Sequence, residues 1–229
     1  YNITINPLDP TGTAGTVVTA NPGHGDTIRY TVDRPGRYEL IVEDGKSCGL
    51  IETIEVPVIF NVGTVNGAPG DIVCVPVTVE NFTNITNAQF SMQWNPFELS
   101  FESIDNLTTA LPSFDNGSFN TGLTNNGQLT VAWADLLFTP HNLPDGSVLF
   151  EVCFEVIGNL GDFAEVDITD APTSIGVGNA NLDFPFSNFP FLLSGGGVNI
   201  TNQILLAEAF GNNVTCGGGS NGSFDLTIA

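Results

Sequence analysis

The sequence predicts an all-β protein made of antiparallel β-sandwiches. Short runs of alternating apolar and polar residues recur along the 229-residue chain, most cleanly in residues 87–94. Gly, Pro, Asn and Asp interrupt these runs, and the 26 Gly and 14 Pro supply turns. No stretch keeps the apolar spacing of an amphipathic helix, although residues 202–211 come nearest. Many short strands with turn signals between them are typical of a sandwich.

Residues 1–58 form the first predicted segment. Its expected strands are residues 1–5, 26–32, 36–44 and 50–60. The strand at 36–44 places Tyr38, Leu40 and Val42 on one face, as a half-buried strand requires.

Residues 59–201 form a second, larger segment, in which we expect the main sandwich. Its expected strands are residues 71–80, 87–94, 99–104, 128–135, 146–158, 164–169 and 195–201. Within residues 87–94 the apolar side chains face one way and the polar ones the other. The apolar set is expected to face the core of an antiparallel sandwich.

Residues 202–229 are expected to be a connector that leads into the first strand of a new unit. The strand consists of Ser223, Phe224, Asp225, Leu226, Thr227 and Ile228. A single strand cannot bury its apolar face or pair its backbone groups, so it needs partner strands.

Charge excludes several partners. The chain has 25 acidic residues and four basic ones, and the basic residues Arg29, Arg34, Arg37 and Lys46 all precede Cys48. Such a surface repels phosphate, which argues against nucleic acid, and it repels anionic lipid. The acidic surface either keeps a secreted protein soluble or is screened by divalent cations. We therefore expect no cofactor, with Ca²⁺ as the one alternative. No run of apolar residues is long enough to span a membrane.

The sequence has few residues arranged for catalysis. His24 and His141 are the only histidines, which gives little support to a Ser-His-Asp triad. Glu151 and Glu155 share a strand face, but acidic pairs of this kind occur in any acidic β protein. We expect no enzyme.

Four cysteines stand at positions 48, 74, 153 and 216, without C-x-x-C spacing, which argues against a zinc site. Their even number favours disulfides and an extracellular location. Alternation places Cys74 and Cys153 on the outward faces of their strands. A Cys74–Cys153 bond requires neighbouring strands with Cα atoms within about 7 Å, and the alternative is two free thiols.

The larger segment resembles a cohesin domain, the receptor module of cellulosome scaffolds. The resemblance covers about 140 residues of this segment and rests on residues 63–82, 85–104, 127–135 and 143–158. Pro69-Gly70-Asp71, Trp94-Asn95-Pro96 and Asp145-Gly146 stand where the family has its turn motifs. The resemblance implies a jelly-roll sandwich.

The resemblance also implies a partner-binding face. In cohesins that bind dockerins, the strand matching residues 85–96 supplies an Asn and an Asp to the partner. Asn87 fits the first position, but Gln89 stands where the Asp would be, which replaces a charged acceptor by a neutral amide. The candidate face is Asn87, Gln89, Ser91 and Gln93. The alternative is that these residues are simply the solvated face of a sheet.

The two ends resemble two parts of one unit. Residues 214–229 are similar to the opening of the short immunoglobulin-like repeats in giant surface adhesins of gliding bacteria, and residues 35–56 to their ending. The resemblance implies that residues 202–229 of one unit and 1–58 of the next complete a smaller immunoglobulin-like sandwich. It also implies a Cys48–Cys216 disulfide. Either a peptide bond or strand exchange would join the units.

These expectations converge on a structural function. The chain is expected to be a repeat unit of an extracellular filament or adhesin stalk at the cell surface, with itself as the head-to-tail partner. Covalent continuity and β-strand complementation both remain open. The alternative is a cohesin-type binding module for a dockerin-like or carbohydrate partner.

Overall fold

The structure is a computed structural model, and it describes residues 2–7, 18–19, 36–43, 49–179, 190–202, 207–211 and 224–228. These residues form β-strands in four sheets, together with two short 3₁₀ helices, η1 (Asn116–Ser118) and η2 (Thr124–Asn126). The predicted all-β fold is therefore confirmed. Some expected features lie outside the described residues, namely the strand at 26–32, Ser223, Cys48 and Cys216.

One layer of the central sandwich is a seven-stranded sheet. Its strands are β6 (Thr64–Gly67), β8 (Ile85–Trp94), β10 (Phe119–Asn120), β11 (Gln128–Ala134), β13 (Phe163–Thr169), β14 (Gly176–Asn179) and β16 (Gly196–Ile200). Their order is β10-β11-β8-β13-β16-β6, and β14 also pairs with β8. All pairs are antiparallel except β16 with β6, which is parallel.

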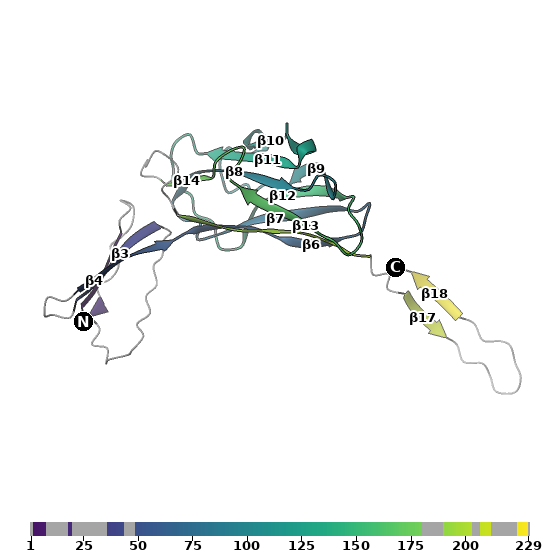
Figure 1. Cartoon of the computed structure of the whole chain (residues 1–229), viewed down its shortest axis with the longest axis horizontal. Coiled ribbons are helices and arrows are strands. Elements are labelled where there is room, and N and C mark those ends of the chain that lie inside the picture. The colour runs from purple at the N-terminus through teal and green to yellow at the C-terminus, as the bar shows by residue number, and fades with distance from the viewer. Residues whose placement is uncertain are drawn as a thin grey trace, which may run out of the picture.

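The second layer is a five-stranded sheet. Its strands are β5 (Val58–Val62), β7 (Ile72–Glu80), β9 (Leu99–Asp105), β12 (Ser147–Val156) and β15 (Phe191–Ser194). Their order is β15-β5-β7-β12-β9, with β15 parallel to β5. Figure 1 shows the two layers stacked at the centre of the chain.

The core lies between these two layers, because each strand turns its apolar set inward. Val75, Val77 and Val79 of β7 are fully buried and alternate with more exposed residues. Phe90 of β8 contacts Phe150 of β12 across the sandwich, with ring centroids 6.4 Å apart. Rings from both layers thus fill the space between the sheets.

Residues 170–175 interrupt one strand of the first layer. β13 and β14 pair with the same edge of β8, first Thr169 with Ser91 and then Gly176 with Gln89. The residues between them leave the ladder, and Ala171–Pro172 is a cis peptide. We call residues 170–175 the flap.

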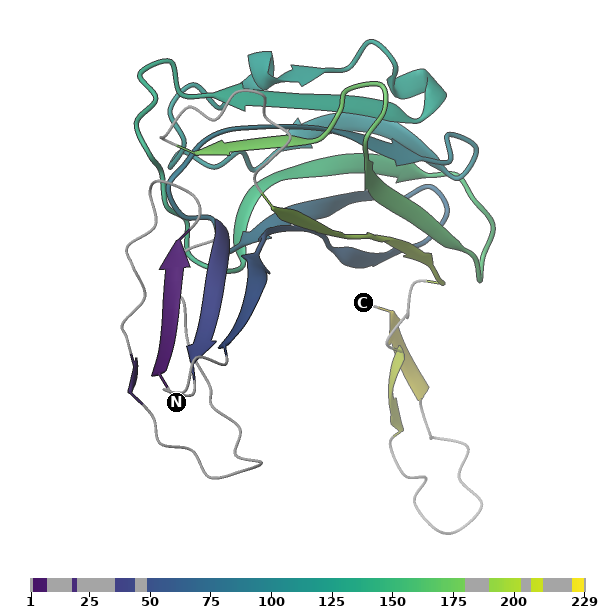
Figure 2. The ribbon, with the colours of Figure 1, turned by 60° about the vertical axis from the view of Figure 1, so that its left-hand side comes forward.

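A four-stranded sheet precedes the sandwich. Its strands are β1 (Asn2–Pro7), β2 (Val18–Thr19), β3 (Gly36–Glu43) and β4 (Gly49–Val56), in the order β2-β1-β3-β4. The single strand expected at 50–60 is wrong: it divides into β4 and β5 at Pro57, which has no N–H to donate to a ladder. Figures 1 and 2 show this sheet projecting from one end of the sandwich.

A hairpin follows the sandwich, projecting from the opposite end of it (Figure 1). β17 (Ala207–Gly211) pairs with β18 (Phe224–Ile228) in an antiparallel register. The expected connector at 202–211 is therefore wrong for Ala207–Gly211, where a neighbouring strand supplies backbone partners. Among the described residues no helix is long and apolar enough to cross a membrane.

Candidate binding face

The outward face of β8 carries the four polar residues that the sequence singled out. They differ in exposure: Gln93 is exposed, Gln89 is half-buried, and Asn87 and Ser91 are buried. The alternative of a simply solvated face is therefore wrong for Asn87 and Ser91. A neighbouring part of the chain covers them.

The flap supplies the cover over Ser91 and Gln89. Ser91 Oγ donates to the Thr173 carbonyl at 3.0 Å and accepts from the Thr173 N–H at 2.8 Å. Gln89 Nε2 donates to the Ser174 carbonyl at 3.0 Å. Because both side chains are hydrogen-bonded to the flap, the flap covers the middle of the outward face of β8 and divides that face into two parts.

A shallow hollow lies on the β11 side of the flap. We call it the partner groove; it measures about 150 Å³ and is lined by Asn87, Ala88, Gln89, Ala132, Trp133 and Ala134. The side chains of Ala132 and Ala134 are exposed and small, so they leave room above the sheet. The groove thus combines a small apolar floor with amide groups.

Asn87 is the polar centre of this groove. Its Nδ2 donates to Thr86 Oγ1 at 3.1 Å, whereas its Oδ1 is buried and has no hydrogen-bond donor within the described part of the chain. Gly178 of β14 packs against this amide, and a Cβ there would collide with it. A buried acceptor without a donor is costly, so a donor from a bound partner would stabilise it.

The loop after β11 borders the groove and is held rigidly. With Asp135 ionised, His141 Nε2 donates to Asp135 Oδ2 at 2.7 Å, and the Leu137 N–H donates to Oδ1 at 2.8 Å. The hydrogen bond from His141, followed by that from Leu137, lowers the pKa of Asp135 below its ordinary value. His141 and Ile85 also exchange backbone hydrogen bonds, which tie the loop to the start of β8.

This rigid loop displays two large apolar side chains. Leu136 is 81% exposed and Leu137 is 85% exposed, beside the half-exposed Phe138. Our sequence reasoning missed them. The signal was present as three consecutive apolar residues, Leu136 to Phe138, directly after a strand whose alternation they break.

The opposite sheet carries the disulfide. Cys74 of β7 and Cys153 of β12 are cross-strand neighbours with Cα atoms 4.0 Å apart, and their sulfurs are bonded. Cys153 faces away from the core but is 1% exposed, because β7 and β9 flank it. Asp105 completes the one cluster of metal-ligating side chains in the described ranges, but the two sulfurs are engaged with each other.

The expected inter-unit strand corresponds to β18, and one of its edges is occupied by β17 of the same chain. Its other edge has no neighbour among the described residues. The Cys48–Cys216 pair lies outside the described residues, so that pairing stays a prediction.

Comparison with known proteins identifies the sandwich. The model of the cohesin domain family matches residues 58–183, more than half of the 229 residues. A search of curated proteins gives no match.

Several solved cohesins share the fold. A type I cohesin from Clostridium thermocellum, solved in complex with a dockerin, has a TM-score of 0.51 and 15% identity, over 63% of this chain and 99% of that one. The seventh type I cohesin of a scaffoldin from Pseudobacteroides cellulosolvens has a TM-score of 0.53 and 14% identity, over 66% of this chain and 96% of that one. A cohesin from Clostridium acetobutylicum has a TM-score of 0.52 and 21% identity, over 63% of this chain and 91% of that one.

Proposed function

The chain belongs to the cohesin domain family, and from that membership we propose that it is a protein-binding module that receives a dockerin-like domain on the outward face of β8 and β11. The family is one of non-catalytic binding modules. We place the module in an extracellular, cell-surface protein, in keeping with the disulfide between Cys74 and Cys153.

The buried Oδ1 of Asn87 is the observation that carries this proposal. Asn87 lines the partner groove, its Oδ1 lacks a donor in the described residues, and it sits on the strand that the family uses for its partner. A partner hydroxyl or N–H that reaches Asn87 would satisfy this acceptor and gain the free energy that its isolation costs.

Apolar contact would supply most of the affinity. Leu136 and Leu137 stand exposed beside the groove on a loop that Asp135 and His141 hold in place. Rigid, exposed apolar side chains next to a small hollow are suited to a partner helix that presents its own apolar residues. Gln89, already bonded to the flap, adds no charge, so we expect a partner that does not depend on a carboxylate here.

The test is binding to a panel of purified dockerin modules, measured by biolayer interferometry. We expect at least one dockerin to bind, and Leu137→Asp to weaken that binding about tenfold or more, because it places a charge in an apolar contact. Asn87→Ala should also weaken it, since the buried acceptor disappears.

Ile72→Asp is the matched control, because Ile72 is 66% exposed on β7 of the opposite sheet. It should bind as the unmodified protein does. The proposal is wrong if no dockerin in the panel binds, or if Ile72→Asp weakens binding as much as Leu137→Asp.

A second function is favoured by the strands outside the sandwich. We propose that residues 1–58 and 202–229 are connecting units on either side of the 59–201 sandwich, so that copies join head to tail in a filament or stalk. β4 is an edge strand of its sheet and exposes Leu50, Ile51 and Ile54, while β17 and β18 form a two-stranded hairpin within the described part of the chain. Exposed edges and two-stranded hairpins are stabilised by further strands.

Light scattering after size-exclusion chromatography tests this second function. The chain should form species that grow with concentration, and Ile51→Lys should shift them toward the monomer. Leu192→Lys is the control, because Leu192 is an exposed apolar residue on β15, an edge strand of the five-stranded sheet. A monomer at all concentrations would exclude joining by strand exchange.

A further inference from the structure

A second and larger hollow lies on the same face of the sandwich, on the other side of the flap. It measures about 570 Å³ and is lined by Gln93, Trp94, Asn95, Pro96, Glu98, Asn126, Phe163, Glu165, Asp167 and Thr169. This volume is within the range of about 300–1,000 Å³ that is usual for small-molecule sites. We call this hollow the polar cleft.

The polar cleft is rich in side chains that can form hydrogen bonds. The carboxylates of Glu98, Glu165 and Asp167 and the amides of Gln93 and Asn126 have no side-chain partner within the residues that the structure describes. Carboxylates accept hydrogen bonds from hydroxyl groups, and amides both donate and accept. A ligand with many hydroxyl groups would therefore satisfy this lining.

An exposed aromatic residue completes the cleft. Phe163, at the start of β13, is 48% exposed and shares its strand face with Glu165 and Asp167. Trp94 is also among the lining residues, but its ring packs in the core against Phe101 and Phe154 of the other sheet. An exposed ring beside hydrogen-bonding groups fits a ligand that has both an apolar and a polar surface.

Charge limits which ligand can enter. No Lys or Arg follows Lys46 in the sequence, so the sandwich offers no cation to balance the three carboxylates. Phosphorylated, sulfated and acidic sugars would be repelled. A neutral sugar combines hydroxyl donors for the carboxylates with an apolar ring face for Phe163.

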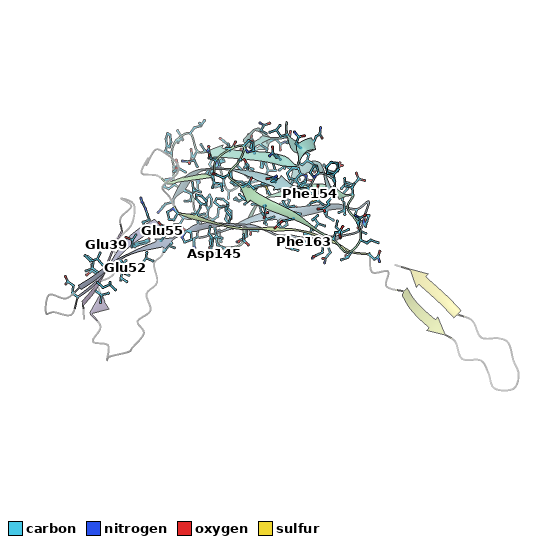
Figure 3. The ribbon with its side chains drawn as sticks, in the orientation of Figure 1. Glu39, Glu52, Glu55, Asp145, Phe154 and Phe163 are labelled. Carbon is cyan, nitrogen blue, oxygen red and sulfur yellow. A yellow bond between two sulfur atoms is a disulfide. The ribbon has the colours of Figure 1, made fainter. Side chains whose placement is uncertain are left out.

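We propose that the polar cleft binds a neutral polysaccharide, with Phe163 as the stacking platform and Asp167 and Glu165 as acceptors for sugar hydroxyls. Asp167 lies over Gly195, where a Cβ would collide with its carboxylate, so the glycine leaves room for this acceptor beside the cleft. In Figure 3, Phe163 lies toward the end of the sandwich from which the chain continues to β17.

The polar cleft is separate from the partner groove. Ser91 and Gln89 are bonded to the flap, and the two hollows share no lining residue. A sugar could thus bind while the partner groove is occupied, and the proposal does not depend on dockerin binding.

Isothermal titration calorimetry of the full chain with neutral oligosaccharides tests the proposal. The probes are linear hexaoses of β-1,4-linked glucose, xylose and mannose, each against the same chain. We expect one of them to bind at one site, and Phe163→Ala to weaken it about tenfold or more through the lost ring contact. Asp167→Asn keeps the shape of the side chain and should weaken the same sugar by removing a charged acceptor.

Two controls separate the cleft from the rest of the surface. Phe97→Ala removes an aromatic residue that is 84% exposed in the neighbouring turn but does not line the cleft, and Leu137→Asp alters the partner groove. Both should bind the sugar unchanged. The proposal is overturned if none of the three sugars binds, or if Phe97→Ala weakens binding as much as Phe163→Ala. It is also overturned if the cleft variants leave sugar binding unchanged and alter only the binding of a lysine-rich peptide or Ca²⁺.

Discussion

The N-terminal sheet and the sandwich are built from equally alternating strands, yet they differ in burial. In the sandwich, Phe60, Phe90 and Phe150 are essentially fully buried because a second sheet covers the first. In the described residues of the N-terminal sheet, the buried apolar side chains are Ile5 and Tyr38. Every residue of β4 before Val56 is exposed. Alternation therefore specifies a strand, but only a second layer makes a core.

The largest expected effect is on the sandwich core. Phe150→Ala should lower the free energy of unfolding by about 3–5 kcal/mol, because it removes a buried ring and leaves a cavity. Urea unfolding followed by tryptophan fluorescence measures this, since Trp94 and Trp133 both belong to the core.

Tyr38→Ala is the counterpart in the N-terminal sheet. It should leave that sandwich transition unchanged, because Tyr38 lies outside the core cluster. An equal loss from Tyr38→Ala would show that the two regions unfold as one cooperative unit.

The next largest effect concerns the disulfide, which joins cysteines 79 residues apart. Replacing both Cys74 and Cys153 by Ala should lower the free energy of unfolding by about 2–4 kcal/mol, mainly by loosening the unfolded chain. The same measurement on the reduced protein should agree. If the double variant is as stable as the oxidised protein, two free thiols describe these residues better than a bond.

A smaller, pH-dependent effect is expected at the loop after β11. Hydrogen bonds lower the pKa of folded Asp135, so its ionised form stabilises the fold above the unfolded pKa of about 3.8. This contribution is lost as the pH falls through the lowered folded pKa. Asp135→Asn should therefore be less stable than the unmodified protein at neutral pH, and the difference should shrink below about pH 4. Thermal unfolding across this range measures it, and a pH-independent difference would contradict it.

The smallest effect is expected on β4. Ile51→Lys should change the free energy of unfolding of the dilute chain by no more than about 0.5 kcal/mol, because Ile51 is 63% exposed. Chemical unfolding monitored by circular dichroism checks this. A loss above 1 kcal/mol would show that another strand or sheet covers β4 in solution, and the contrast between the two regions would no longer hold.

Local pattern was enough to predict most strands of the sandwich. Residues 71–80, 87–94 and 128–135 alternate cleanly, and β7, β8 and β11 occupy those positions. The same pattern predicted the outward direction of Cys74 and Cys153, which are paired in the structure.

The features that the pattern did not predict depend on contacts between distant residues. Ser91 has the alternation of a solvated residue, but Thr173, 82 positions later, covers it. The exposed Leu137 depends on the bond between Asp135 and His141, which alternation does not encode. The polar cleft also brings Gln93 beside Asp167, and only strand pairing shows this proximity.

The two parallel strand pairs have a mechanical consequence. The chain enters the sandwich at Val58, where β5 begins beside β15, and leaves it at Ile200, where β16 ends beside β6. A force that pulls Val58 and Ile200 apart acts along these paired strands, so it loads their hydrogen bonds in shear, all at once, rather than peeling them one after another. A domain connected in this way is suited to carry tension along a chain.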